Sequence, residues 1–60
     1  MVEVRESVPL DDSVAHNAVQ YKSAHTFNVT EYRDLFLYAK NGDVIAFYPK
    51  GSFDKVQIFP

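Results

Sequence analysis

With 60 residues, the chain can form one small domain, and it has no cysteine, which excludes disulfide bonds as a support for a thin core. Its net charge of −2, with acidic and basic residues intermixed, argues against a large field of one sign for nucleic acid or an anionic membrane. A hydrophobic content of 47% is typical of a folded core. No repeat, low-complexity segment or linker interrupts the chain, so we expect residues 1–60 to form a single domain.

The expected compartment follows from what the chain lacks. It has no cysteine, no apolar run of membrane-spanning length, and no basic and then apolar leader after Met1. We therefore expect a cytoplasmic protein with no membrane partner. Because a domain this small and free of disulfides gains stability by burying surface between subunits, we also expect a homo-oligomer or a complex with another protein.

The N-terminal stretch VEVRESV places Val2 and Val4 in an alternating pattern, with Val8 less cleanly in phase. This pattern predicts a short first β-strand. We expect the strand to stop at Pro9, because proline cannot donate a hydrogen bond to a neighbouring strand.

The next stretch, PLDDSVAHNAVQYK, predicts a short helix over residues 13–22. Asp12 is of the residue type that caps helix N-termini, and Lys22 places positive charge near the other end, where the helix dipole favours it. A strand through AVQYKSA is the alternative, because Val19 and Tyr21 also alternate with polar residues. The apolar stripe of the helix would consist of Val14, Ala15, Ala18 and Val19.

Two further segments predict strands. HTFNVTEY alternates Phe27 and Val29 with polar residues, which is the period of a half-buried strand. LFLYAK and DVIAFY then flank Asn41-Gly42, a pair that favours a two-residue type I′ turn, and predict a β-hairpin. A helix over residues 30–40 is the alternative there, because glycine also follows helix C-termini. After the turn-rich PKGSFD, the run KVQIF predicts a last strand.

A two-residue turn fixes which residues of the hairpin lie opposite each other. Counting back from Asn41-Gly42 gives the pairs Lys40–Asp43, Ala39–Val44, Tyr38–Ile45, Leu37–Ala46, Phe36–Phe47 and Leu35–Tyr48. Because side chains alternate between the two faces of a strand, these residues separate into two sets. The bulkier set, which we expect to form the core, contains Phe36, Tyr38, Ile45 and Phe47, joined by Val56 and Ile58 of the last strand.

The opposite face of the predicted sheet is also mostly apolar, although an antiparallel sheet normally leaves one face to water. The predicted helix could cover it, the N-terminal strand could curl the sheet into a barrel, or a partner could pack on it. If a partner covers this face, the expected binding residues are Leu35, Leu37, Ala46, Tyr48 and Phe59.

These elements predict an α+β fold that is mostly β: a small antiparallel sheet of four to five strands with one short helix in the N-terminal third. His16 and His25 lie on different predicted elements, and no cysteine or carboxylate cluster completes a metal shell. Ser52, in KGS, lacks the glycine spacing of a phosphate-binding loop. We therefore expect no catalytic residue, metal or cofactor, and a protein that is not an enzyme.

The favoured hypothesis for function is a non-catalytic protein-binding or regulatory module that acts through its apolar β-sheet face and self-associates. The alternative is a nucleic-acid-binding or transcription-regulatory β domain, in which aromatic side chains stack on bases. That alternative is less favoured because Lys40 lies at one end of the predicted sheet and Lys50 and Lys55 at the other, without a continuous basic stripe. The candidate stacking residues are Tyr21, Tyr38, Tyr48 and Phe53.

Overall fold

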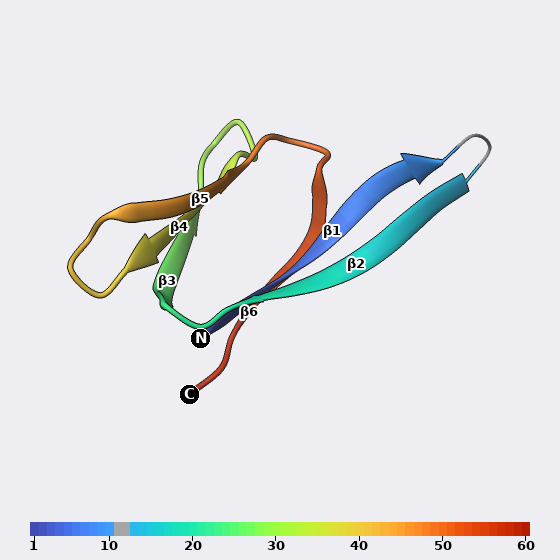
Figure 1. Cartoon of the computed structure of the whole chain (residues 1–60). Coiled ribbons are helices and arrows are strands. Elements are labelled where there is room, and N and C mark those ends of the chain that lie inside the picture. Colours follow the sequence, from blue (N-terminus) through green and yellow to red (C-terminus); the bar gives the residue numbers. More distant parts are fainter. Residues whose placement is uncertain (11–12) are drawn as a thin grey trace.

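The computed structural model describes residues 1–10 and 13–60, and over these residues the protein is all-β (Figure 1). The prediction of an α+β fold with a single sheet is therefore wrong, because the described residues contain no helix and form two sheets. The strands are β1 (Val2–Leu10), β2 (Ser13–Tyr21), β3 (Ala24–Val29), β4 (Leu35–Ala39), β5 (Val44–Tyr48) and β6 (Phe53–Ile58).

Each sheet has three antiparallel strands, in the order β2-β1-β6 in one and β3-β4-β5 in the other. The two sheets lie across from each other, and the far end of the β1–β2 hairpin projects beyond them (Figure 1). The core lies between the sheets, because its buried residues come from both. These residues are Val2 and Val4 on β1, and Ala24, Leu35, Leu37 and Tyr48 on the other sheet.

The segment predicted as a helix over residues 13–22 is strand β2. It pairs with β1 along its whole length, from Leu10↔Ser13 to Val2↔Tyr21, without a break in register. A short helix with a narrow stripe of small residues has little intrinsic stability, so pairing with a neighbouring strand prevails. The alternative of a strand through residues 18–24 is confirmed as far as Tyr21, where β2 ends before a turn. The proposed cap at Asp12 lies outside the described residues.

Strand β1 continues through Pro9, where the sequence predicted its end. The Ser7 N–H donates to Ser52 O at 3.0 Å, on the side of β1 that faces β6. Successive backbone groups alternate in direction, so the Pro9 nitrogen points the same way, away from β2. The pairing with β6 reaches only to Glu6, and proline therefore removes no hydrogen bond from either ladder.

The predicted β4–β5 hairpin is confirmed, but its turn is not the predicted two-residue type I′ turn. The Gly42 N–H donates to Ala39 O at 2.9 Å and the Ala39 N–H donates to Asp43 O at 2.8 Å, which encloses the three residues 40–42. A type I′ turn needs positive φ at both central residues, whereas here Gly42 has a φ of 95° and Asn41 does not lie in that region. The Asn41 side chain instead accepts from the Asp43 N–H at 3.0 Å.

The longer loop shifts the register near the turn, and a β-bulge then restores it. Tyr38 lies opposite Val44, not Ile45, so the predicted pairs closest to the turn are wrong. The register shifts again between Leu37 and Tyr38, leaving Ile45 as the extra residue on β5. Beyond the bulge, three predicted pairs are confirmed: Leu37–Ala46, Phe36–Phe47 and Leu35–Tyr48.

The last strand does not extend the β4–β5 hairpin. Strand β6 pairs with β1, with Val56 opposite Val4 and Ile58 opposite Val2, so it belongs to the other sheet. Val56 consequently packs against the core from the side opposite to β4 and β5. The sheet of β1, β2 and β6 thereby covers the second apolar face of the hairpin. This differs from the three coverings expected from sequence, because the N-terminal strand belongs to a separate second sheet and does not close one sheet into a barrel.

Candidate functional site

The inner face of β3-β4-β5 carries most of the residues that the sequence predicted as a binding surface. Leu35 and Leu37 are fully buried, Tyr48 is buried, and Ala46 is half-buried and packs against the same core. A partner could not cover Leu35, Leu37 and Tyr48 without separating the sheets. Phe59, just beyond β6, is 36% exposed and is the only one of the five predicted residues at the surface.

The residues predicted as the core lie mainly on the outside. Phe36 and Tyr38 of β4 and Val44 and Phe47 of β5 do not belong to the core cluster, and Phe47 is 50% exposed. We call these four residues the outer aromatic face. The prediction that the bulkier set forms the core is therefore wrong for Phe36, Tyr38 and Phe47, and also for Ile58, which is 52% exposed. It holds for Ile45, which the bulge displaces, and for Val56, since both pack against the core. Val44 belonged to the opposite predicted set and shares this face because it pairs with Tyr38.

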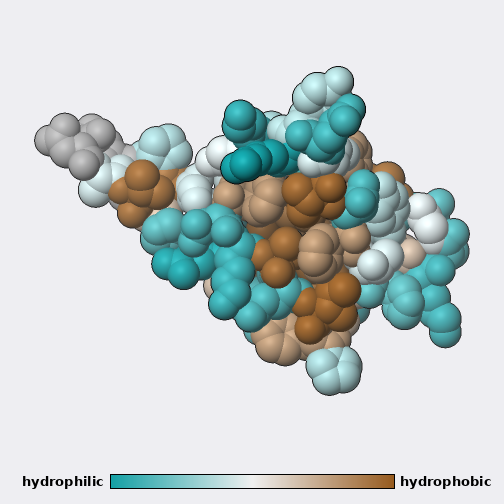
Figure 2. Space-filling view, turned by 180° about the vertical axis from the view of Figure 1, so that it is seen from behind, coloured by the Kyte–Doolittle hydropathy of each residue, from teal (hydrophilic) through white to brown (hydrophobic). Residues whose placement is uncertain are grey.

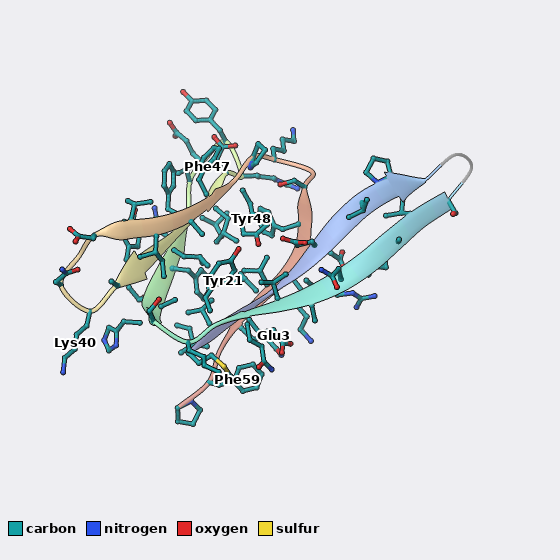
Figure 3. The ribbon with its side chains drawn as sticks, viewed as in Figure 1. Glu3, Tyr21, Lys40, Phe47, Tyr48 and Phe59 are labelled. Carbon is teal, nitrogen blue, oxygen red and sulfur yellow. The ribbon has the colours of Figure 1, made fainter. Side chains whose placement is uncertain are left out.

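The rings of the outer aromatic face form a contiguous row across two strands. Phe36 and Phe47 lie directly opposite each other, with ring centroids 4.9 Å apart and planes tilted by 55°. Tyr38, two residues along β4, stacks with Phe36, with ring centroids 6.4 Å apart and planes 22° apart. Figure 3 shows Phe47 directed away from the space between the sheets, in which Tyr21 and Tyr48 point toward each other. This row is aromatic surface that the single chain leaves uncovered.

A signal in the sequence distinguishes the two faces of the hairpin, although bulk alone assigns them the wrong way round. The inner face includes small residues, of which Ala24 is buried and Ala46 half-buried. Small side chains let a second sheet approach closely, whereas the four larger side chains on the other face would hold it away. Size complementarity with the valines of β1, not total bulk, identifies the core face.

A chain of polar side chains connects the two sheets at one end of the core. The Tyr48 hydroxyl donates to Glu6 Oε2 at 2.7 Å and lies 2.5 Å from the Tyr21 hydroxyl, while Asn17 Nδ2 donates to Glu6 Oε1 at 3.4 Å. Burial, followed by the hydrogen bonds to Tyr21 and Glu6, raises the pKa of Tyr48 far above its ordinary value. The neutral hydroxyl therefore holds β5 to β1 and β2, which is a structural role.

Charged groups are distributed around the sheets without converging. Arg5 and Asp54 form an ion pair at 3.5 Å, with both side chains about half-exposed. His16 lies on β2 and His25 on β3, and both are exposed. Within residues 1–10 and 13–60 we find no pocket and no group of three or more residues of metal-ligating type. None of the described segments forms a helix of the length and apolarity needed to cross a bilayer.

The candidate base-stacking residues are divided between inside and outside. Tyr48 is buried, and Tyr21 and Phe53 pack against the core, where their rings make edge contacts with Tyr48 at 6.4 Å. Only Tyr38 lies on the outer aromatic face. The aromatic residues predicted from sequence therefore do not form one platform, and Phe36 and Phe47 take the places beside Tyr38.

Apolar surface also occurs elsewhere on the molecule. Seen from behind, hydrophobic side chains occupy the middle of the body and hydrophilic ones surround them (Figure 2). Ile58 on β6 is 52% exposed, and Val8 and Val14 are exposed on the projecting hairpin. Comparisons of the chain with protein-family models, with curated proteins and with solved structures gave no match.

Proposed function

We propose that the protein is a non-catalytic binding module of accessory or regulatory type that docks on another polypeptide through its outer aromatic face. The observation that carries this proposal is the half-exposed Phe47, whose ring contacts Phe36, which in turn stacks with Tyr38. A partner that covers the row removes aromatic surface from water, which is favourable by about 25 cal/mol for each Å².

The composition of this surface also suits protein recognition. Aromatic side chains are enriched at the centres of protein interfaces because they bury a large rigid area at a small cost in conformational entropy. The neighbouring strand β3 presents the exposed polar residues Thr26 and Asn28, which lie opposite Tyr38 and Phe36. An apolar centre with a polar border on one side is the usual anatomy of an interface.

The test uses a peptide library displayed on phage, with the whole protein as bait. Peptides selected by the wild-type chain are expected to contain aromatic or aliphatic anchors and to shift the amide NMR signals of Phe36, Tyr38, Val44 and Phe47. Phe47→Ser is expected to abolish their binding while the chain stays folded, because Phe47 is outside the core. Ile58→Ser is the matched control, since Ile58 is equally exposed at 52% but lies on the other sheet.

Two results would contradict this proposal. One is a selected peptide that shifts signals of a different surface, and the other is a Phe47→Ser variant that binds as tightly as the wild type. A single-stranded oligonucleotide tested in parallel addresses the nucleic-acid alternative. Binding that depends on Phe47 but weakens steeply with salt would favour phosphate contacts and stacking over a protein partner.

A further inference from the structure

The edges of the two sheets differ in how they are protected against pairing with another strand. Natural edge strands are usually short, bulged, charged or interrupted by proline. Strand β3 contains a register shift, β5 has five residues and a bulge, and β6 contains a bulge beside Asp54 and Lys55. Strand β2 has none of these features: it has nine residues, an unbroken register, no proline, and no Asp, Glu, Lys or Arg.

The register shows which backbone groups β2 offers at this edge. The Phe59 N–H donates to Met1 O and the Ser7 N–H donates to Ser52 O, so the odd-numbered residues of β1 direct their backbone toward β6. The even-numbered residues of β1 therefore face β2, where their partners are odd-numbered. It follows that the backbone N–H and C=O groups directed away from β1 are those of Val14, His16, Ala18 and Gln20.

A second observation points to the same edge. The pairing of β1 with β6 reaches only to Glu6, so beyond this point β1 and β2 form a ribbon of two strands that projects from the body (Figure 1). An isolated two-stranded ribbon is marginally stable in water, whereas a third strand makes it stable. The ribbon also carries the exposed side chains Val8 and Val14, at 42% and 56%. Within the described residues, the ribbon therefore has no third strand beside it, and its two valine side chains are exposed to water.

From these observations we infer that the β2 edge is an association site for a second copy of this chain, whose own β2 pairs with it antiparallel about a two-fold axis. The occupant follows from the composition of the edge. When two identical strands pair about a two-fold axis, a charged residue of one copy lies opposite or near the same residue of the other copy. Like charges placed opposite each other are destabilising. Because β2 carries no Asp, Glu, Lys or Arg, this repulsion does not arise.

The register that uses every free backbone group is centred on Asn17. It places His16 opposite Ala18 of the second copy and Val14 opposite Gln20 of the second copy, so all outward N–H and C=O groups of both strands are paired. On the other face of the strand, Ala15 meets Val19 of the second copy, and both are half-buried apolar residues in the single chain. A shift of the register by two residues leaves outward groups unpaired at both ends.

This dimer also supports the projecting ribbon. In the antiparallel arrangement, the ribbon of one chain lies beside the Tyr21 end of β2 in the second chain, where β2 adjoins the core. The two sheets join into one, in the order β6-β1-β2 followed by β2-β1-β6 of the second copy. The β2 side of the ribbon then has a neighbouring strand, so the two-stranded segment becomes three-stranded in the assembly.

The first test measures mass by sedimentation from micromolar to millimolar concentration. The wild type is expected to sediment at twice the chain mass of 6.9 kDa. Ala18→Pro removes one outward N–H without touching the β1 ladder and is expected to weaken dimerisation about a hundredfold or more. Ala18→Thr, which keeps this N–H, is the control and should remain dimeric.

The second test reads the register and does not depend on how well the proline variant folds. The wild-type chain has no cysteine, so single substitutions report on one position at a time. Asn17→Cys places the two thiols across the axis, in a non-hydrogen-bonded pair with Cα atoms about 4.5 Å apart, which suits a disulfide. In Val14→Cys, the cysteine of one chain lies opposite Gln20 of the other, so the two cysteines are six residues apart along the strands, roughly 20 Å. Mild oxidation should cross-link the first variant rapidly and the second only slowly.

A wild type that stays monomeric over this concentration range would overturn the inference, and so would equal cross-linking of the two cysteine variants. A dimer that survives Ala18→Pro would overturn it as well. Phe47→Ser separates this inference from the proposed function, because it alters the outer aromatic face alone. If Phe47→Ser abolishes the dimer and Ala18→Pro does not, self-association occurs through the outer face and the β2 edge is not the site.

Discussion

The hydrogen bond between Tyr48 and Glu6 should contribute a large part of the stability of this small protein. It joins the last residue of β5 to β1, at 2.7 Å, and so connects the two sheets. Tyr48 is buried and Glu6 half-buried, so water competes only weakly for this bond. Tyr48→Phe removes the hydroxyl and keeps the ring, whose edge contacts with Tyr21 and Phe53 remain.

The expected magnitude follows from the kind of bond that is lost. A hydrogen bond to a charged group contributes about 1.5 to 3 kcal/mol. Glu6 keeps its bond from Asn17 at 3.4 Å and Tyr21 is only half-buried, which places Tyr48→Phe at about 2 kcal/mol. For a chain of 60 residues the total free energy of unfolding is on the order of 3 to 9 kcal/mol. The substitution should therefore remove a large fraction of it.

Urea unfolding of a double-mutant cycle measures this term. Tyr48→Phe, Glu6→Ala and the double variant should give a coupling free energy of about 1 to 2 kcal/mol, because alanine leaves no acceptor for the Tyr48 hydroxyl. Tyr32→Phe is the control, because Tyr32 is 72% exposed and loss of its hydroxyl should change the free energy of unfolding by less than about 0.5 kcal/mol. A coupling free energy near zero would refute the reasoning, since the two side chains would then act independently across the sheets.

Two further predictions concern pH and backbone strain. The pKa of Tyr48 is raised above 10.0, its unfolded-state value, so above pH 10 the unfolded chain binds fewer protons than the folded chain. The free energy of unfolding should therefore fall as pH rises, by up to about 1.4 kcal/mol per pH unit. The fall should be smaller in Tyr48→Phe. Arg33, with a φ of 66°, closes its loop as Gly42 closes the β4–β5 loop. Arg33→Gly should therefore stabilise by about 0.5 to 1 kcal/mol, and Gly42→Arg should destabilise by about 1 to 2 kcal/mol, in thermal unfolding. A flat alkaline profile in the wild type, or a destabilised Arg33→Gly, would contradict them.

The β4–β5 hairpin shows how far sequence alone can predict local structure here. Asn41-Gly42 between two apolar runs is enough to place the hairpin, because glycine tolerates the positive φ that a tight loop requires. It is not enough to fix the loop length, since a three-residue loop also places its glycine at positive φ. The three predicted pairs farther from the turn, Leu37–Ala46, Phe36–Phe47 and Leu35–Tyr48, are confirmed only because the bulge at Ile45 offsets the longer loop.

The errors at β2 and in the core have a common cause, which is that both depend on contacts between distant segments. Residues 13–21 have a weak helical stripe and a weak strand alternation, and pairing with β1 decides between them. The two faces of β4–β5 are both apolar, and the placement of β6 beside β1, not beside β5, decides which face is covered. Neither contact leaves a local signal, so the binding residues predicted from sequence lie mostly in the core.

The two proposed surfaces share one property: each promotes unspecific association if it stays exposed to water. An exposed aromatic row and a long uncharged edge strand both promote unspecific association, and natural domains usually suppress them with charges or proline. This chain does so at β6, where Asp54 and Lys55 lie beside a bulge, and does not do so at β2 or around Phe47. Because Phe47 and the β2 edge belong to different sheets, a second copy can cover one while a partner covers the other. A dimer built on β2 would then present two outer aromatic faces, and a partner with two matching sites would bind it more tightly than a single chain without any new contact.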